Sequence, residues 1–248
     1  MKTMGRRKQA PVWLFDLDNT LHDASHAIFP AINLNMNAYI ARVLADCGEA
    51  CDADAVNAVR RHYWQRYGAT LLGMVKHHQV SAADFLREAH RFGDLAAMVR
   101  AERGLARLLR RLPGRKILLT NAPRRYARDV LRHLGLHPHF AKHVPIEAMR
   151  VHGRFRPKPS RLLLRKLLAR EGLRAAQCVL VEDTLANLKT AKALGLRTAW
   201  VTQYLREEKA RHLHPGAGTG AAATKRPIYV DVKVQSVAQL FRELHRLR

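Results

Sequence analysis

The sequence predicts an α/β fold in which a parallel sheet carries helices on both faces and a small all-helical domain is inserted after the first strand. Three observations predict it. Short continuous apolar runs alternate with amphipathic stretches, which is the pattern of parallel strands buried on both faces. Glycines follow the amphipathic stretches, as they often do where helices end. One long segment early in the chain has helical periods and no strand pattern.

Five apolar runs are candidate strands of the sheet. They span residues 12–15, 116–120, 178–181, 198–202 and 228–234. Helical periods over residues 124–134, 160–171 and 185–194 lie between them, and each ends before a glycine. A last helix is expected over residues 237–247. This alternation of strands and helices indicates an α/β sheet with helices on both faces.

The inserted domain is expected to consist of three helices, over residues 28–46, 53–67 and 81–91. The last helix opens on Ser81 with Asp84 three residues later, a capping pattern. The chain therefore divides into a basic disordered tail (residues 1–10), a discontinuous core (residues 11–21 and 101–248) and a helical domain (residues 22–100). Within the core, residues 214–226 are expected to form a mobile loop rich in Gly, Ala and Thr.

The composition predicts an ordinary globular protein, because 248 residues with 48% hydrophobic content can bury one substantial core. Asp16 and Asp18 interrupt the first apolar run too early for a signal peptide or a membrane span, so we expect a cytoplasmic protein. Of the three cysteines, Cys47 and Cys51 are spaced for one helix face rather than for a CxxC motif. Reduced thiols are therefore expected. The sequence specifies no oligomeric state.

The net charge of +24 raises the question of nucleic-acid binding, because clustered basic residues release phosphate counterions on binding. Here arginine recurs through nearly every predicted helix, and no recognisable DNA- or RNA-binding motif accompanies it. The pattern favours a solvated basic surface, which could also steer an anionic substrate. A basic nucleic-acid-associated protein with little catalysis stays open as an alternative.

The strongest chemical signal is the pair Asp16 and Asp18 directly after the apolar run that ends at Phe15. Residues two apart in an extended chain project to the same side, so both acids can face one site at the carboxyl end of the sheet. Burying two acids is costly unless they hold a metal or take part in chemistry. Glu182 and Asp183 repeat the pattern after another buried run and supply the hard oxygen ligands that suit Mg²⁺.

Two further segments carry polar groups at places where they can be presented to a ligand. Thr120 and Asn121 end a strand with a hydroxyl and free backbone amides that can hold phosphate oxygens, although such a pair is more often a helix cap or a turn. Lys158 stands between Pro157 and Pro159, which stiffens its presentation, whereas a lone lysine usually faces solvent.

Four segments in this order, FDLDNT, LLTNA, RPKP and VLVEDTLANLKTAKALG, resemble the motifs of the haloacid dehalogenase (HAD) superfamily of phosphohydrolases. The resemblance implies a Rossmann-like sheet and a Mg²⁺-dependent phosphatase that hydrolyses a small phosphate monoester through an aspartyl-phosphate. By the same resemblance, Asp16 would be the nucleophile and a metal ligand. Asp18 would protonate the leaving oxygen, then deprotonate water, and offer its backbone carbonyl to the metal. Such an acid needs a raised pKa.

The remaining motif residues take their roles from the same resemblance. Thr120 and Asn121 would bind the transferring phosphoryl group, and Lys158 would neutralise its charge and hold Asp16. Asp183 would ligate Mg²⁺, with Glu182 helping directly or through water. Many relatives carry a further acid where this chain has Asn187, and an amide is a weaker ligand, so Mg²⁺ affinity is in question. Because the dehalogenase branch lacks the second aspartate of the first motif, dehalogenation is disfavoured.

The helical domain resembles the C1-type cap of the small-molecule branch, which limits access to compact substrates. The stretches FDLDNTLHDASHAIFPAINLNMNAYI and YWQRYGATLLGM resemble the pyrimidine 5'-nucleotidase subfamily, which implies a nucleoside monophosphate as the phosphorylated metabolite. Candidate contacts to a base or sugar, all of them also candidates for simple cap packing, are His22, Tyr63, Tyr67, Thr70 and His77. No HExxH spacing is present, so the sequence does not predict a zinc site. A phosphomutase or phosphotransferase of the same fold remains an alternative.

Overall fold

The computed structural model describes residues 10–205 and 225–247. The predicted tail therefore lies outside the described residues apart from Ala10, and so does the predicted loop over residues 214–226 apart from its last two. Among the described helices, none combines the length and the apolarity that a membrane crossing requires.

A six-stranded sheet forms the centre of the molecule and confirms the predicted fold class. Its strands lie in the order β3-β2-β1-β6-β7-β8, and every neighbouring pair is parallel. The bounds are β1 Val12–Phe15, β2 Lys116–Leu119, β3 Lys142–Val144, β6 Cys178–Glu182, β7 Arg197–Val201 and β8 Val232–Val234. The chain winds in opposite directions from β1, through β2 to β3 on one side and through β6 to β8 on the other.

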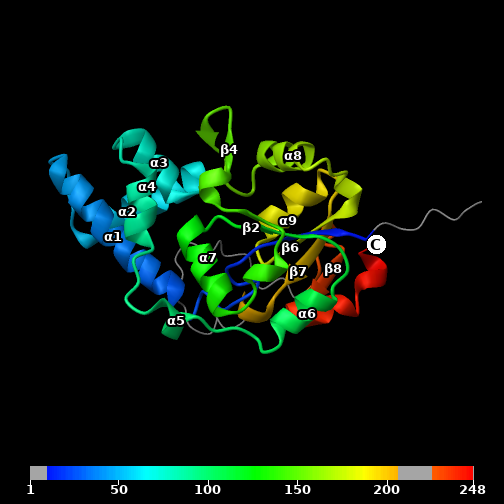
Figure 1. Ribbon diagram of the computed structural model, residues 1–248. Helices are drawn as coiled ribbons and strands as arrows, with labels where there is room; N and C mark the ends of the chain where they lie inside the picture. Colours follow the sequence, from blue (N-terminus) through cyan, green and yellow to red (C-terminus); the bar gives the residue numbers. More distant parts are fainter. Residues whose placement is uncertain (1–9, 206–224, 248) are drawn as a thin grey trace, which may run out of the picture.

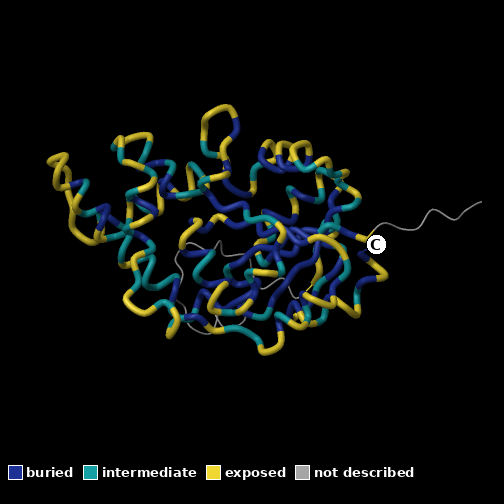
Figure 2. The backbone as a smooth tube through the Cα atoms, viewed as in Figure 1, coloured by how far each residue is buried: buried dark blue, intermediate teal, exposed yellow. Residues whose placement is uncertain are grey.

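Helices cover both faces of this sheet because its strands are apolar on both sides. Trp13 and Phe15 of β1 belong to one hydrophobic cluster, and Leu14 between them belongs to another. The first cluster includes α6 (Leu105–Arg111), α7 (Arg124–His133) and the 3-10 helix η4 (Val237–Phe241); the second includes α8 (Arg161–Arg170) and α9 (Leu185–Lys192). Figure 1 shows α8 and α9 on one side of the sheet and α6 on the other, and Figure 2 shows the strands between them buried.

Four helices between β1 and β2 form a separate group beside the sheet, which we call the helical segment (Figure 1). They are α1 (Ile28–Asp46), α2 (Ala53–Tyr67), α3 (Thr70–His77) and α4 (Ala82–Ala89), and the short α5 (Leu95–Met98) leads back to the sheet. Their apolar faces meet in a third hydrophobic cluster that includes Tyr39, Tyr63 and Phe85. The hydroxyl of Ser81 caps α4 by accepting from Asp84 N at 3.3 Å, as its sequence pattern predicts.

Some elements differ from those predicted. The sequence pattern gave no sign of β3, because this strand has three residues and two of them are the polar Lys142 and His143. It also gave no sign of the antiparallel hairpin of β4 (Arg150–Val151) and β5 (Arg154–Phe155), whose turn places His152 and Gly153 at positive φ. The predicted last strand is shorter than expected, starting at Val232.

The predicted helix over residues 237–247 is instead two 3-10 turns, η4 and η5 (Leu244–Arg246). Both helix types bring residues three apart to the same side, so the apolar spacing does not separate them. Cys47 caps the end of α1 and Cys51 lies in the following loop, so the expectation that they share one helix face is wrong; Gly48 at φ 71° turns the chain between them. Both are free thiols.

Candidate active site

The ends of the three central strands bring most of the predicted site residues together. Asp16 follows β1, Thr120 follows β2, and Glu182 and Asp183 stand at the end of β6. Because β2 and β6 flank β1, these positions meet at the carboxyl edge of the sheet, where the direction of winding reverses. Carboxylate oxygens of Asp16, Glu182 and Asp183 all lie within 4.8 Å of one another.

Lys158 joins this cluster from a loop. Its side chain is 5% exposed, and its Nζ lies 2.6 Å from Asp16 Oδ1 and 2.7 Å from Glu182 Oε2. Its backbone is fixed by Asn121: Lys158 N donates to Asn121 Oδ1 at 2.9 Å, and Asn121 Nδ2 donates to Lys158 O at 3.1 Å. The peptide bond from Lys158 to Pro159 is cis. The amide of Asn121 therefore positions the lysine from the end of the neighbouring strand.

The electrostatics of this cluster favour a bound cation. Burial, and then Glu182, raises the pKa of Asp16 well above its usual range, although Lys158 opposes this. Burial also raises the pKa of Glu182 to about 7 and that of Asp183 to about 6. Burial would lower the pKa of Lys158, but the two adjacent carboxylates raise it, so this residue is an ammonium ion. Three carboxylates beside one ammonium leave a surplus that one divalent cation would neutralise.

Glu182 and Asp183 have different hydrogen-bond partners, which indicate different roles. Glu182 has one oxygen on Lys158, and its Oε1 accepts from Thr184 N at 3.2 Å. Asp183 accepts from the Thr184 hydroxyl at 3.2 Å, and its backbone oxygen accepts from Trp200 Nε1 at 2.8 Å. Glu182 thus anchors the lysine, whereas Asp183 and Asp16 are the acids best placed to offer hard oxygen ligands to Mg²⁺.

Asp18 lies apart from this cluster in its contacts and is held by two other side chains. Its Oδ1 accepts from Tyr126 Oη at 2.6 Å and lies 2.9 Å from His22 Nε2. His22 is fully buried and Tyr126 is 3% exposed. The tyrosine comes from the first turn of α7, so two elements distant in sequence converge on one carboxylate oxygen.

The expectation that the pKa of Asp18 is raised is wrong for this arrangement. Burial does act to raise it, but the hydrogen bond and charge of His22 and the hydrogen bond from Tyr126 outweigh burial, and the pKa is lowered. His22 had been a candidate contact for a base or sugar; the structure instead places it against Asp18. Sequence reasoning did not identify Tyr126, whose only signal is its place just after the LLTNA segment.

The loop between Asp18 and His22 is shaped by Asn19. Its φ of 55° lies in the left-handed region that asparagine tolerates better than most residues. Its Oδ1 accepts from Ala24 N and Ser25 N, each at 3.1 Å, and its Nδ2 donates to Ser25 Oγ at 2.8 Å. This buried network closes the loop and so brings His22 back to Asp18.

Two other predicted residues are buried near these strand ends. Thr120 is 1% exposed, and its Oγ1 accepts from Ala122 N at 3.1 Å, which leaves the hydroxyl proton for a ligand to accept. Asn187 lies buried on the first turn of α9, the helix that follows Asp183.

The other candidate contacts pack within the helical segment. Tyr63 stacks on His77 with ring centroids 5.4 Å apart, and Tyr67 Oη lies 2.6 Å from His77 Nε2. The hydroxyl of Thr70 donates to Arg60 O at 3.3 Å. These contacts agree with the packing alternative for these side chains. One histidine of the segment does reach toward the site: the His90 ring lies 5.4 Å from that of Tyr126.

Comparison with known proteins gives a consistent result. A family profile described as haloacid dehalogenase-like hydrolase matches residues 12–195. A HAD phosphatase from Thermococcus onnurineus has a similar structure, with a TM-score of 0.60, 17% identity, and coverage of 97% of this chain and 100% of its own. The HAD-type protein YfnB from Bacillus subtilis, crystallised with magnesium, gives a TM-score of 0.56 at 16% identity, with coverage of 96% of this chain and 100% of its own. An L-2-haloacid dehalogenase from Xanthobacter autotrophicus gives a TM-score of 0.57 at 17% identity, with coverage of 96% of this chain and 99% of its own.

Proposed function

The chain belongs to the haloacid dehalogenase-like hydrolase family, and we propose that it is a Mg²⁺-dependent phosphatase that hydrolyses a small phosphate monoester through an aspartyl-phosphate on Asp16. One observation carries this proposal: a buried carboxylate is held at 2.6 Å by a buried ammonium group, beside two further acids and a separately held Asp18. Nucleophile, cation and acid are thus distinct groups at one edge of the sheet.

In the first step an oxygen of Asp16 attacks phosphorus, and the bond from phosphorus to the leaving oxygen breaks. Lys158 keeps the Asp16 carboxylate oriented and lies where it can also offset charge on the phosphoryl oxygens. The hydroxyl of Thr120 can donate to one of those oxygens. Mg²⁺, held by Asp16 and Asp183, would supply further positive charge to the phosphoryl group when bound.

Asp18 then completes both half-reactions. It gives a proton to the leaving oxygen, and afterwards takes one from the water that hydrolyses the aspartyl-phosphate. Tyr126 and His22 hold this carboxylate, which keeps its orientation constant between the two steps. The arrival of an anionic phosphate raises the pKa of a nearby carboxyl, which favours the acid form needed in the first step.

The helical segment supports a compact substrate, because as a cap it would cover the site and exclude large molecules. The contact of His90 with Tyr126 connects this segment to Asp18 through the tyrosine. A nucleoside monophosphate of the kind that pyrimidine 5'-nucleotidases cleave is our specific candidate. The net charge of +24 would attract any such anion.

Two other activities of the same fold compete with this proposal. A phosphotransferase would use the same residues but pass the phosphoryl group to a second hydroxyl. A dehalogenase is represented among the similar structures, but displacement of a halide needs no proton donor, and the buried contacts of Asp18 would then have no purpose.

Replacement of Asp16 by asparagine tests the central claim. Asp16→Asn should abolish Mg²⁺-dependent hydrolysis of p-nitrophenyl phosphate. Asp129→Asn, at a half-exposed carboxylate that pairs with Arg128 on α7, should keep it. Activity that survives in Asp16→Asn would rule out the aspartyl-phosphate.

A screen of UMP, CMP, AMP, sugar phosphates and phosphoglycolate identifies the substrate. Equal release of phosphate and alcohol identifies a phosphatase, whereas less phosphate than alcohol identifies a transferase. Steeply salt-dependent DNA binding without hydrolysis would favour the nucleic-acid alternative.

A further inference from the structure

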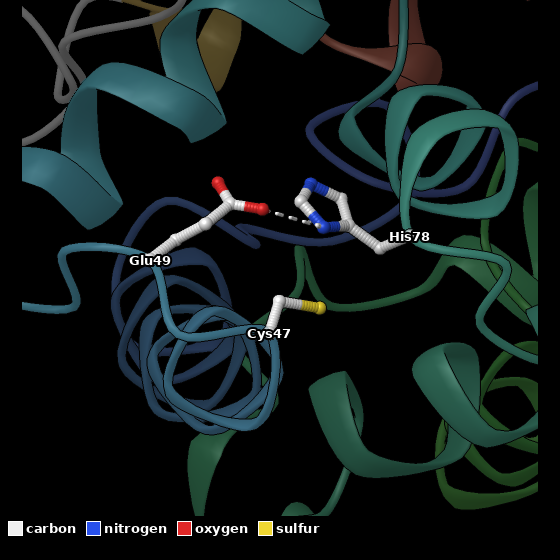
Figure 3. A group of neighbouring side chains, drawn as sticks. All are labelled: Cys47, Glu49 and His78. Carbon is white, nitrogen blue, oxygen red and sulfur yellow. Dashed lines mark ion pairs between the residues drawn. The ribbon is translucent and has the colours of Figure 1, made fainter.

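Three side chains with metal-binding chemistry meet in the helical segment, outside the catalytic cluster. Cys47 caps the end of α1, Glu49 follows it by two residues, and His78 caps the end of α3. One ligand atom from each of the three lies within 4.8 Å of the others, and His78 Nδ1 is 3.8 Å from Glu49 Oε1. Figure 3 shows Glu49 and His78 pointing toward each other, with the sulfur of Cys47 close to the space between them.

The turn after α1 accounts for the approach of Cys47 and Glu49. Gly48 at φ 71° occupies the left-handed region, which reverses the chain as the helix ends. The carbonyl ends of both α1 and α3 are directed to this corner, and the negative end of a helix dipole favours a cation. The turn at Gly48 and the negative ends of the two helix dipoles therefore both favour a cation beside Cys47 and Glu49.

Tyr63 gives an independent indication that His78 is prepared as a ligand. The His78 side chain is only 5% exposed, and its Nε2 lies 2.8 Å from Tyr63 Oη. If Nε2–H donates to the tyrosine oxygen, Nδ1 carries the lone pair, and Nδ1 is the nitrogen that faces Glu49. Metal-bound histidines generally use their second nitrogen in this way. Gly73 makes room for the tyrosine, since a Cβ there would come within 2.1 Å of Tyr63 Cγ.

The donor set selects the kind of metal. One thiolate, one imidazole and one carboxylate suit Zn²⁺, whereas Mg²⁺ prefers oxygen ligands alone. Cys47 is exposed and Glu49 is 53% exposed, so the corner is open to water, which could fill a fourth position. The absence of HExxH spacing does not bear on this cluster, because its ligands come from two segments distant in sequence. The packing of both α1 and α3 against α2 brings these segments together.

We propose that Cys47, Glu49 and His78 form a Zn²⁺ site that fastens the end of α1 to the end of α3. A ligand that binds only the folded state raises the apparent stability, so Zn²⁺ should raise the melting temperature of the protein. The site is separate from the Mg²⁺ position at Asp16, and its occupancy does not depend on the proposed phosphatase function.

Cobalt provides the direct test, because a thiolate ligand gives Co²⁺ an intense ultraviolet charge-transfer band that oxygen ligands do not give. The full-length protein, stripped with EDTA and desalted under reducing conditions, is titrated with CoCl₂ and then with ZnCl₂. We expect one equivalent of Co²⁺ to produce the band and Zn²⁺ to remove it. Absence of the band in the unmodified protein would overturn the proposal.

Variants assign the band to these residues. Cys47→Ser should lose it, and Cys51→Ser, a second exposed cysteine close by in sequence, should keep it. Tyr63→Phe keeps the ring but removes the partner of His78, and should weaken Zn²⁺ affinity about 10- to 100-fold. Asp16→Asn should leave the band unchanged. A band that persists in Cys47→Ser, or disappears in Cys51→Ser or Asp16→Asn, would contradict the assignment; circular dichroism verifies that each variant is folded.

Discussion

Replacement of Tyr126 by phenylalanine removes one hydroxyl from the buried side of Asp18 and leaves the ring in place. The hydrogen bond that is lost is short, at 2.6 Å, and runs to a carboxylate. Hydrogen bonds to charged groups contribute about 1.5–3 kcal/mol. If that contribution serves to orient Asp18 in the transition state, the loss corresponds to about 10- to 150-fold in rate.

The loss should depend on the leaving group, because Asp18 acts as a proton donor only where the leaving oxygen needs a proton. An alkyl phosphate leaves as a basic alkoxide, whereas p-nitrophenyl phosphate leaves as a stable phenolate. In kcat/KM, which reports the steps up to formation of the aspartyl-phosphate, Tyr126→Phe should therefore show the full loss on the alkyl ester. The loss on p-nitrophenyl phosphate should be several times smaller.

The assay compares kcat/KM for both esters in the unmodified protein, in Tyr126→Phe and in Tyr229→Phe. Tyr229 lies before β8 near the edge of the sheet, and its substitution controls for the general effect of losing a tyrosine hydroxyl. Equal losses on the two esters, with the fold intact by circular dichroism, would show that Tyr126 supports the structure rather than the acid. No loss on the alkyl ester would refute the role assigned to Tyr126 in orienting Asp18.

Three further changes test the packing and the charges. Lys158→Met leaves Asp16 and Glu182 as buried acids without their cation. It should abolish activity and lower the free energy of unfolding, measured in urea, by about 3–5 kcal/mol. The control Lys189→Met, at an exposed lysine, should do neither. Gly73→Ala would force the Tyr63 ring to move and should cost about 1–3 kcal/mol, whereas Gly93→Ala, with no atom within 4 Å of its Cβ, should be nearly neutral. The hydrogen bond from Lys142, with help from Arg115 and against burial, lowers the pKa of Glu171. The ionised Glu171 therefore stabilises the fold at pH values above about 4.3, the pKa of this group in the unfolded state. This stabilisation is lost as pH falls through the lower pKa of the folded state. Glu171→Gln should lower the melting temperature at pH 7, by an amount corresponding to about 0.2–1 kcal/mol, and this difference should shrink below about pH 4; a constant difference would show that charge is not its cause.

The residues that could be predicted from sequence are those whose position follows from local pattern. Asp16, Glu182 and Asp183 stand at the ends of apolar runs, and the carboxyl ends of parallel strands must meet at one edge. Two helices of the inserted segment were equally predictable, since α1 and α2 have the predicted bounds, whereas α3 was not predicted. By contrast, β3 has neither the length nor the apolar content that marks a buried strand.

The side chains around Asp18 could not be predicted, because they depend on contacts between distant parts of the chain. Tyr126 lies 108 residues from Asp18 in sequence, and on an amphipathic helix it has the pattern of any apolar-face residue. The zinc site that we propose has the same origin, since Glu49 and His78 follow the ends of two helices that both pack against α2. Local pattern places backbone segments, whereas pairing between side chains depends on the tertiary fold.

Asp16 and Asp18 show how two acids two residues apart can be given different chemical tasks. β1 ends at Phe15, and the turn at Asn19 directs the chain away from the sheet, so the two carboxylates find different partners. Burial and Glu182 raise the pKa of Asp16, so that a nucleophilic carboxylate there depends on Lys158 and on a cation. His22 and Tyr126 lower the pKa of Asp18 against its burial, so its proton affinity depends on α7 and on the phosphate that enters beside it. Activation of the nucleophile should therefore respond to Mg²⁺, and activation of the acid should respond to Tyr126.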